Sequence, residues 1–556
     1  MFFFTFKPFL LKAFIASITP SQKMKKLLLS LTLIFIALFS SAQKNTILII
    51  ADDLGVDYLS FYATGGDTAI VPNIRSLLAT GIQFNNAWAN PVCSPTRAAM
   101  FTGRYAFRNG VGTVISNAST PQLDTAERSV ARLLRDFSTL NYATANVGKW
   151  HMHLANPVPQ RTFPNYMGYD LYSGNFNGAI SDYSNYVRIK NGVMDTVTNY
   201  ATTQTVNDAM DWLDTLSGQK PFFLWLAFNA PHFPFHKPPN NLHSYSSLPG
   251  TTNHINAFPE LYFKAMVQAM DTEIGRLFQY LDSNNLRDST NIIFIGDNGS
   301  DRDVTQLTNI NHAKGTLYEG GIHIPMIIAG PAVVNPGRQS DALVSTPDLF
   351  ATILELSGFS NWINFIPAAK LPVDAISLVP IILNDTTDVR QWIFSEQFQV
   401  PTNASDAKAM RSKTHKLIRF DSGAIQFYDL TIDPLEANNL FGQSLTILQT
   451  QQYNFLCNEL NALLNQNSCT PLSTSLGENE QENDLPFLFP NPTSKLLNVE
   501  WKNHENETLI LKDAIGKIVK QEKPGVWDVS HLQSGVYFLS TEKTKWNRAM
   551  KVFISN

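Results

Sequence analysis

Cysteine is scarce in this chain, and neither sign of charge predominates. Only three cysteines, Cys93, Cys457 and Cys469, occur among 556 residues, which excludes a small fold built on a disulfide framework. Cys457 and Cys469 are close enough in sequence to form one disulfide, and two unpaired thiols are the equal alternative. The formal net charge of −4 is small and balanced, which argues against nucleic acid as a partner. A content of 44% hydrophobic and 16% charged residues is typical of a globular protein rather than a disordered one.

A short apolar run near the N-terminus is typical of a secretory signal peptide. It spans residues 27–39, follows the basic start Met24-Lys25-Lys26 and precedes small residues at 40–42. The run is shorter than the roughly 20 residues that a membrane-spanning helix needs. We therefore predict an exported protein with a leader and signal peptide over residues 1–42. Translation then starts at Met24 or, alternatively, at Met1 with one long leader.

Four short apolar segments further along the chain each end in polar side chains. They read as strands buried on both faces and span residues 45–51, 142–148, 222–228 and 291–296. Helix-like segments lie between them, at 125–138, 203–216 and 262–281. This alternation predicts an α/β fold with a doubly wound, mostly parallel sheet. Because parallel strands end at the same edge, the polar side chains that follow them should converge there.

The polar residues after these strands are suited to binding a cation and an anion. Carboxylate and amide oxygens for one divalent cation, Ca²⁺ foremost and Mg²⁺ as the alternative, come from Asp52, Asp53, Asp297 and Asn298. Positive charge comes from Arg97, Lys149 and Lys314, and proton carriers near neutral pH are His151 and His232. Each side chain alone has an ordinary structural alternative, such as a solvated charge or a loop histidine. Their joint placement at strand ends favours one site.

One short stretch carries a motif. It reads Cys93-Ser94-Pro95-Thr96-Arg97 and continues into Thr102-Gly103-Arg104. This motif resembles the signature of the type I sulfatases of the alkaline phosphatase superfamily. Further matches are Gly148-Lys149-Trp150-His151, Asp297-Asn298 and the segment from Lys314 to Glu319-Gly320-Gly321. The resemblance covers roughly residues 45–440, most of the chain after the signal peptide.

The resemblance implies that Cys93 is oxidised to formylglycine by a maturation enzyme and that the hydrated aldehyde is the nucleophile. The cation would be bound by Asp52, Asp53, Asp297, Asn298 and residue 93 itself. His232, with Lys314, would protonate the leaving alcohol, and His151 would take the proton from the second hydroxyl. Arg97 and Lys149 would position the diol, and the residues implied to contact substrate are Lys149, His232 and Lys314.

The implied activity is sulfate ester hydrolysis, on a sulfated poly- or oligosaccharide or an aryl sulfate. Two alternatives stay open at this point. The first is a phosphomonoester or phosphonate-ester hydrolase of the same superfamily, and the second is a non-catalytic glycan-binding protein. Side chains proposed for the rim of the pocket are Trp88, Arg104, His236, Arg302 and His323.

The C-terminal part divides into further predicted regions. We expect the catalytic domain over 43–385, a smaller α+β subdomain over 386–469, a polar linker over 470–484 and a terminal domain over 485–556. Short strands expected at 496–501, 508–512, 517–520 and 535–540 predict a small β-sandwich. The motif Phe489-Pro490-Asn491-Pro492 and the segment 532–537 resemble the type IX secretion sorting domain of Bacteroidetes, with a carbohydrate-binding or spacer module as the alternative. This resemblance implies the type IX machinery as a partner and an extracellular or outer-membrane-surface location.

Overall fold

The computed structural model divides into two compact units, with the boundary between Leu472 and Ser473. It describes residues 45–472, apart from 63–65, 140 and 217–219, and residues 486–554, apart from 490–492, 494, 502–505, 514–515 and 542–549. The predicted signal peptide and most of the predicted linker lie outside the described residues. Among the described residues, no helix is both long and apolar enough to span a membrane.

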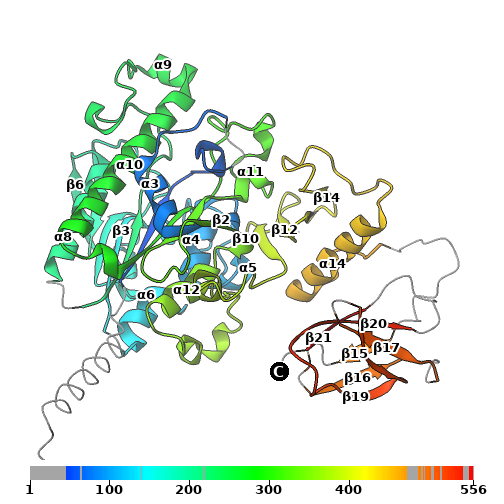
Figure 1. The fold of residues 1–556 in the computed structure, drawn as a ribbon. Helices are drawn as coiled ribbons and strands as arrows, with labels where there is room; N and C mark the ends of the chain where they lie inside the picture. Colours follow the sequence, from blue (N-terminus) through cyan, green and yellow to red (C-terminus); the bar gives the residue numbers. More distant parts are fainter. Residues whose placement is uncertain are drawn as a thin grey trace, which may run out of the picture. The chain divides into compact units, whose positions relative to one another are not determined.

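A ten-stranded sheet organises the larger unit (Figure 1). Its order is β10 (Arg338–Ser345), β2 (Gly81–Trp88), β9 (Met326–Ala329), β8 (Thr290–Gly296), β1 (Asn45–Ala51), β7 (Phe222–Ala227), β3 (Ala143–Lys149), β4 (Leu171–Asn175), β5 (Tyr186–Lys190) and β6 (Val193–Val197). Strands β8, β1, β7, β3 and β4 run parallel to one another, as do β10 and β2. Strand β9 is antiparallel to both of its neighbours, and β4, β5 and β6 alternate in direction. The predicted α/β fold with a mostly parallel sheet is confirmed.

Helices cover both faces of this sheet, which is why the central strands read as continuous apolar runs (Figure 1). On β1, Ile47 and Ile49 pack toward one face and Leu48 and Ile50 toward the other, and all four are fully buried. The first face is covered by α8 (Ala201–Thr215) and α10 (Pro259–Ser283), and the second by α4 (Cys93–Thr102) and α12 (Asp348–Leu356). Shorter helices are α3 (Pro72–Ser76), α5 (Ala106–Asn109), α6 (Val130–Arg132), α7 (Phe163–Tyr166), α9 (Thr252–Ala257), α11 (Glu319–Ile322) and α13 (Val379–Ile382).

The helix predicted over 125–138 is wrong in its first part. Regular structure begins at Val130 with α6 and continues as a π-helical turn over Leu133–Phe137. The residues before it make other contacts: Glu127 is ion-paired with Arg104, and Ser129 Oγ accepts a hydrogen bond from the Arg132 N–H at 2.9 Å. A serine that caps a helix in this way marks its start.

A second, antiparallel sheet follows in the same unit. It contains β11 (Ile393–Gln397), β12 (Ala407–Arg411), β13 (His415–Phe420) and β14 (Ile425–Asp429). Helix α14 (Ile447–Leu464) packs on it through Tyr453 and Leu456. Cys457 on α14 forms a disulfide with Cys469, which decides between the two alternatives for these cysteines.

The smaller unit consists of two antiparallel sheets around a shared core. One contains β15 (Phe487–Phe489), β16 (Leu496–Glu500) and β19 (Gly525–Asp528). The other contains β18 (Ile518–Glu522), β17 (Leu509–Lys512), β20 (Gly535–Thr541) and β21 (Met550–Ile554). Leu497, Leu511, Trp527 and Leu539 meet between them and are buried. The predicted sandwich is present, with β15, β19 and β21 in addition to the strands expected from sequence.

Candidate active site

The predicted oxygen ligands and Lys149 lie at one edge of the main sheet. Asp52 and Asp53 follow β1, Asp297 and Asn298 follow β8, and Lys149 is the last residue of β3. Strands β1 and β8 pair in parallel with Ala51 opposite Gly296, so the residues after each strand are neighbours. The two aspartates after β1, the pair after β8 and Lys149 are all fully buried. The fold therefore brings together residues that are about 250 positions apart in sequence.

Close backbone approach and unusual backbone angles shape this edge. Gly148 has φ 104°, and a Cβ atom there would lie 1.8 Å from the carbonyl oxygen of Ala227 on β7. Glycine is required because only its backbone tolerates both conditions. Asp53 and His151, which are not glycines, also have positive φ values of 68° and 53°. Such angles cost free energy, and surrounding contacts must hold these two residues in place.

Cys93 is the first residue of α4 and is 2% exposed. Its Sγ lies 3.0 Å from His151 Nδ1, and His151 Nε2 lies 3.2 Å from the carbonyl oxygen of Ile115. A carbonyl only accepts hydrogen bonds, so Nε2 carries the hydrogen and the lone pair of Nδ1 faces residue 93. Burial, with the positive charges of Lys149 and Arg97, lowers the pKa of His151 well below its ordinary value. A neutral histidine base therefore faces residue 93.

Two of the carboxylates are held by buried cations. Lys149 Nζ lies 2.8 and 2.6 Å from the two carboxylate oxygens of Asp52. Arg97 Nη2 and Nε donate to Asp297 Oδ2 at 2.7 and 3.0 Å, and Arg97 Nη1 donates to the carbonyl oxygen of Lys149 at 3.0 Å. Burial raises the pKa of Asp52 well above its ordinary value, and Lys149 opposes that effect. These contacts fix the orientation of both carboxylates.

Asp53 is held by the ammonium group of Lys314 and the side-chain amide of Asn298. Lys314 Nζ donates to Asp53 Oδ2 at 2.5 Å, and Asn298 Nδ2 donates to Asp53 Oδ1 at 2.8 Å. His232 Nε2 lies 3.5 Å from Asp53 Oδ2. Burial alone would raise the pKa of Asp53, but His232, Lys314 and Lys149 together lower it below its usual range. Burial lowers the pKa of His232 to about 4, with Lys149 and Lys314 adding to the effect and Asp53 opposing it.

The donor set fits a divalent cation. Ligand atoms of Asp52, Cys93 and Asp297 all lie within 4.8 Å of one another, as do those of Asp52, Asp53 and His232. Asn298 Oδ1 is buried with no hydrogen-bond partner among the described residues, as expected of a ligand oxygen. The three carboxylates are matched by Lys149, Arg97 and Lys314, so the bound cation would leave an excess of positive charge. That excess would attract an anionic ester, and oxygen ligands suit Ca²⁺ or Mg²⁺.

Four of the five side chains proposed for the pocket rim contact other residues of the fold. The prediction is wrong for Trp88 and Arg104, which are buried, whereas His236 and His323 are half-buried. Trp88 is fully buried and donates from Nε1 to Glu319 Oε1 at 3.1 Å. Arg104 is buried in an ion pair with Glu127, and His323 lies 3.6 Å from the Glu319 carboxylate. The His236 ring packs 4.3 Å from that of Tyr183. Of the five, only Arg302 is exposed.

A buried ionic cluster beside the site has no counterpart in the sequence interpretation. Lys416 Nζ lies 3.1 Å from Glu319 Oε1 and 2.7 Å from Glu436 Oε1, and Arg411 Nη1 lies 3.0 Å from Glu319 Oε2. Glu319 is five residues after Lys314, so the cluster ties the segment that carries Lys314 to β12 and β13. No local pattern could have indicated it, because Glu319 is about 90 to 120 residues before the other three members.

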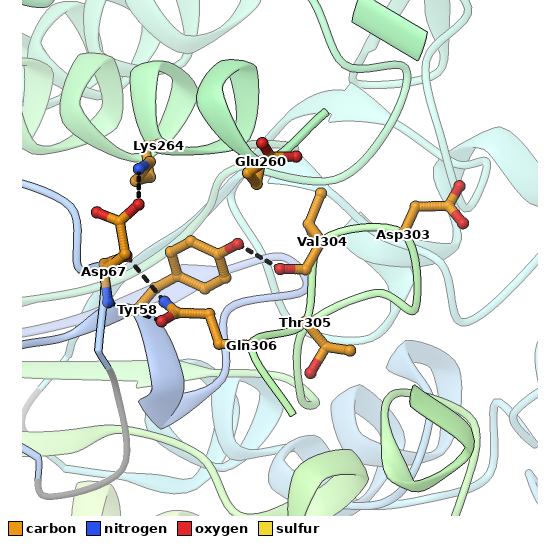
Figure 2. A pocket seen from close by; sticks show the side chains of 8 residues that line it. All are labelled: Tyr58, Asp67, Glu260, Lys264, Asp303, Val304, Thr305 and Gln306. Carbon is orange, nitrogen blue, oxygen red and sulfur yellow. Dashed lines mark hydrogen bonds and ion pairs between the residues drawn. The ribbon is translucent and has the colours of Figure 1, made fainter. Parts of the chain in front are cut away.

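A cavity of about 230 Å³ lies between α10 and the segments that follow β1 and β8 (Figure 2). It is lined by Tyr58, Asp67, Glu260, Lys264, Asp303, Val304, Thr305 and Gln306. Figure 2 shows Lys264 directed at Asp67, and Gln306 Nε2 donates to the Asp67 carbonyl oxygen at 2.9 Å. Three acidic residues and one lysine line this cavity, a balance that disfavours an anionic ester. None of the predicted site residues lines this cavity.

Three family models match the chain. Residues 44–359 match the model described as Sulfatase, and residues 311–467 match N-sulphoglucosamine sulphohydrolase, C-terminal. Residues 487–555 match the Secretion system C-terminal sorting domain, which confirms the resemblance seen in the tail. The tail therefore directs the protein out of the cell, to the extracellular space or the outer-membrane surface.

Similar proteins agree with the first of these matches. Human N-acetylgalactosamine-6-sulfatase is 29% identical over 372 residues, and an uncharacterized sulfatase of Escherichia coli K12 is 28% identical over 388. Each match covers 61% of this chain and 66% of the relative, so the chain spans just under two thirds of their length. The crystal structure of Ps i-CgsB in complex with k-i-k-neocarrahexaose has 26% identity and a TM-score of 0.63, with 78% of this chain and 96% of that chain covered. Since the Sulfatase model alone spans more than half of the sequence, this chain belongs to the sulfatase family.

Proposed function

We propose that the protein is an exported sulfatase that hydrolyses sulfate esters of a carbohydrate through a formylglycine derived from Cys93. The observation that carries the proposal is the surroundings of Cys93. Its Sγ lies 3.0 Å from a neutral histidine base and within 4.8 Å of carboxylate oxygens of Asp52 and Asp297. An ordinary buried cysteine has no need of such neighbours.

The Cys93 sulfur marks the place of the two hydroxyls of a hydrated formylglycine. Because Cys93 is 2% exposed, a maturation enzyme would have to oxidise it before this segment folds. When bound, a divalent cation would hold a hydroxyl and the sulfate oxygens and would offset the developing negative charge. The residues that would bind the cation are Asp52, Asp53, Asp297 and Asn298, with residue 93.

Two histidines would act on either side of the sulfur transfer. One hydroxyl oxygen of the diol would bond to sulfur and lose its proton to a neighbouring carboxylate, and the ester S–O bond would break. His232 Nε2 faces the carboxylate cluster and would give its proton to the departing alcohol oxygen, with Lys314 beside it. The pKa of His232 is about 4 in the free protein, and a bound anionic ester would raise it toward the value that an acid needs. His151 Nδ1 would take the proton of the second hydroxyl, so that sulfate leaves and the aldehyde returns.

Two relatives support a carbohydrate as the substrate class. Human N-acetylgalactosamine-6-sulfatase is named for a sulfated sugar, and Ps i-CgsB was crystallised with an oligosaccharide. Export through the type IX machinery would place the enzyme where large glycans are accessible. The two relatives and the export route together favour a sulfated poly- or oligosaccharide over a small aryl sulfate.

The test is sulfate release by the mature protein, produced together with a formylglycine-generating enzyme. The probes are carrageenan oligosaccharides, 6-sulfated N-acetylgalactosamine, and the pair 4-nitrophenyl sulfate and 4-nitrophenyl phosphate. We expect sulfate release from at least one saccharide, faster cleavage of the aryl sulfate than of the phosphate, and complete loss of both in Cys93→Ala with an unchanged circular dichroism spectrum.

Mass analysis of the peptide that carries residue 93 reports whether conversion took place. Faster cleavage of the phosphate would favour a phosphomonoesterase instead. A converted protein that cleaves none of these esters would favour a non-catalytic glycan-binding role.

A further inference from the structure

Phe233 is an exposed aromatic residue next to the proposed acid of the reaction. Its side chain is 48% exposed, whereas His232 before it is 5% exposed. The two ring centroids are 4.4 Å apart and the ring planes are inclined by 30°. The ring is thus both accessible to a ligand and in contact with a polar residue of the site, and aromatic side chains beside a few polar groups line most ligand sites.

The two ring nitrogens of His232 have different partners. His232 Nδ1 donates to the carbonyl oxygen of Phe233 at 2.8 Å, and its Nε2 lies 3.5 Å from Asp53 Oδ2. One nitrogen is thus held by the backbone of Phe233, and the other faces the reacting centre. The same bond fixes the Phe233 backbone, so the aromatic ring is attached to a rigid point.

We propose that the Phe233 ring is a stacking platform for the sugar that carries the sulfate ester, an inference that rests on the proposed function. The ester oxygen must come within about 3 Å of His232 Nε2 to receive a proton. The sugar ring is bonded to the carbon that bears this oxygen. It can therefore come within van der Waals reach of a side chain that packs on the imidazole. The apolar C–H face of a pyranose matches the face of the phenyl ring, and the hydroxyl edge of the sugar stays solvated.

The chain contains a matched control for this position. Phe258 is 46% exposed and also packs on a histidine, and its ring centroid lies 4.9 Å from that of His254. Phe258 stands between α9 and α10, and no residue of α9 belongs to the predicted site. Truncating Phe258 removes the same surface area and the same kind of ring contact without touching the acid.

The experiment compares the wild type with Phe233→Ala, Phe233→Trp and Phe258→Ala. The probes are a carrageenan hexasaccharide and 6-sulfated N-acetylgalactosamine, with inorganic sulfate as an inhibitor that occupies the anion site without a sugar. We expect Phe233→Ala to raise KM for the hydrolysed saccharide roughly five- to tenfold, the value for one lost aromatic contact. The inhibition constant of sulfate and kcat should stay within twofold of the wild type. Phe233→Trp should restore KM, and Phe258→Ala should match the wild type throughout.

An unchanged KM in Phe233→Ala would overturn the platform. An equal rise in the inhibition constant of sulfate would overturn it too, because the change would then act through His232 on the anion site. A converted wild type that hydrolyses no sulfate ester refutes the proposed function itself, which is a different result from either of these.

Discussion

Replacing Lys149 by methionine isolates the buried ion pair at the centre of the site. Lys149 and Asp52 are both fully buried, and the ammonium contacts both carboxylate oxygens. Lys149→Met keeps a side chain of similar length and removes the charge. In the metal-free protein the Asp52 carboxylate then loses its main partner inside the fold.

The expected loss follows from that geometry. Removing one partner of a buried pair costs about 3–5 kcal/mol. Arg97 Nη2 remains 3.7 Å from Asp52 Oδ1, so the loss should lie near the lower end, at about 3 kcal/mol. A unit of roughly 430 residues unfolds with an entropy of about 0.9 kcal/mol/K, which converts the loss to about 3–4 °C in Tm. Calcium should reduce the difference, because a bound cation partners the same carboxylate.

The assay is thermal unfolding by circular dichroism in EDTA and again in calcium. Lys408→Met is the control, because Lys408 Nζ also contacts both oxygens of one carboxylate, Asp421, at 2.7 and 3.0 Å. That pair is partly exposed, so its loss should cost no more than about 1 kcal/mol. Equal Tm values for Lys149→Met and Lys408→Met in EDTA would show that the buried Lys149–Asp52 pair stabilises the fold no more than a partly exposed pair does.

Three further results are expected. Chelation by EDTA should abolish sulfate release and leave Tm almost unchanged, and calcium or magnesium should restore the activity. Activity that persists in metal-free buffer would exclude a divalent cation from the reaction. Burial raises the pKa of Glu396 to about 8, and its Oε2 has no hydrogen-bond partner among the described residues. The folded state therefore keeps the proton of Glu396 up to a higher pH than the unfolded state does. The contribution of Glu396 to the free energy of unfolding is complete below pH ~4.5 and falls by up to ~1.4 kcal/mol per pH unit until about pH 8. Denaturant unfolding at pH 5 and 8.5 should show this slope in the wild type and a flatter one in Glu396→Gln. Lys416→Met should cost about 3–5 kcal/mol in the same assay, because Glu319 and Glu436 lose a shared buried cation, and a loss below 1 kcal/mol would contradict that role.

The central strands could be predicted from sequence because burial on both faces leaves a simple signal. The segments at 45–51 and 291–296 match β1 and β8 to within one residue. Strands nearer the sheet edge escaped prediction. In β6, for example, four of its five residues, Val193 to Thr196, are exposed, so the strand lacks an apolar run. Its pairing with β5, rather than its composition, makes it a strand.

The candidate site was predicted to a large extent because its residues follow buried strands or stand in a short motif. Residues whose role depends on distant partners could not be found in that way. Glu319 reads as part of a local motif, yet its carboxylate contacts Lys416 and Arg411 on another sheet. Phe233 is one of 37 phenylalanines, and only its exposure beside His232 distinguishes it.

The charge balance of the site has a consequence for the order of assembly. Asp52, Asp53 and Asp297 each have a lysine or arginine partner within 2.8 Å, so none depends on an ion to be buried. Folding would then not require metal loading, unlike in small zinc domains that are unfolded without metal. On the proposed function, the chain would reach its folded shape during export and acquire the cation afterwards. A modest affinity suffices there, since extracellular calcium modules work at dissociation constants of about 10⁻⁴–10⁻³ M.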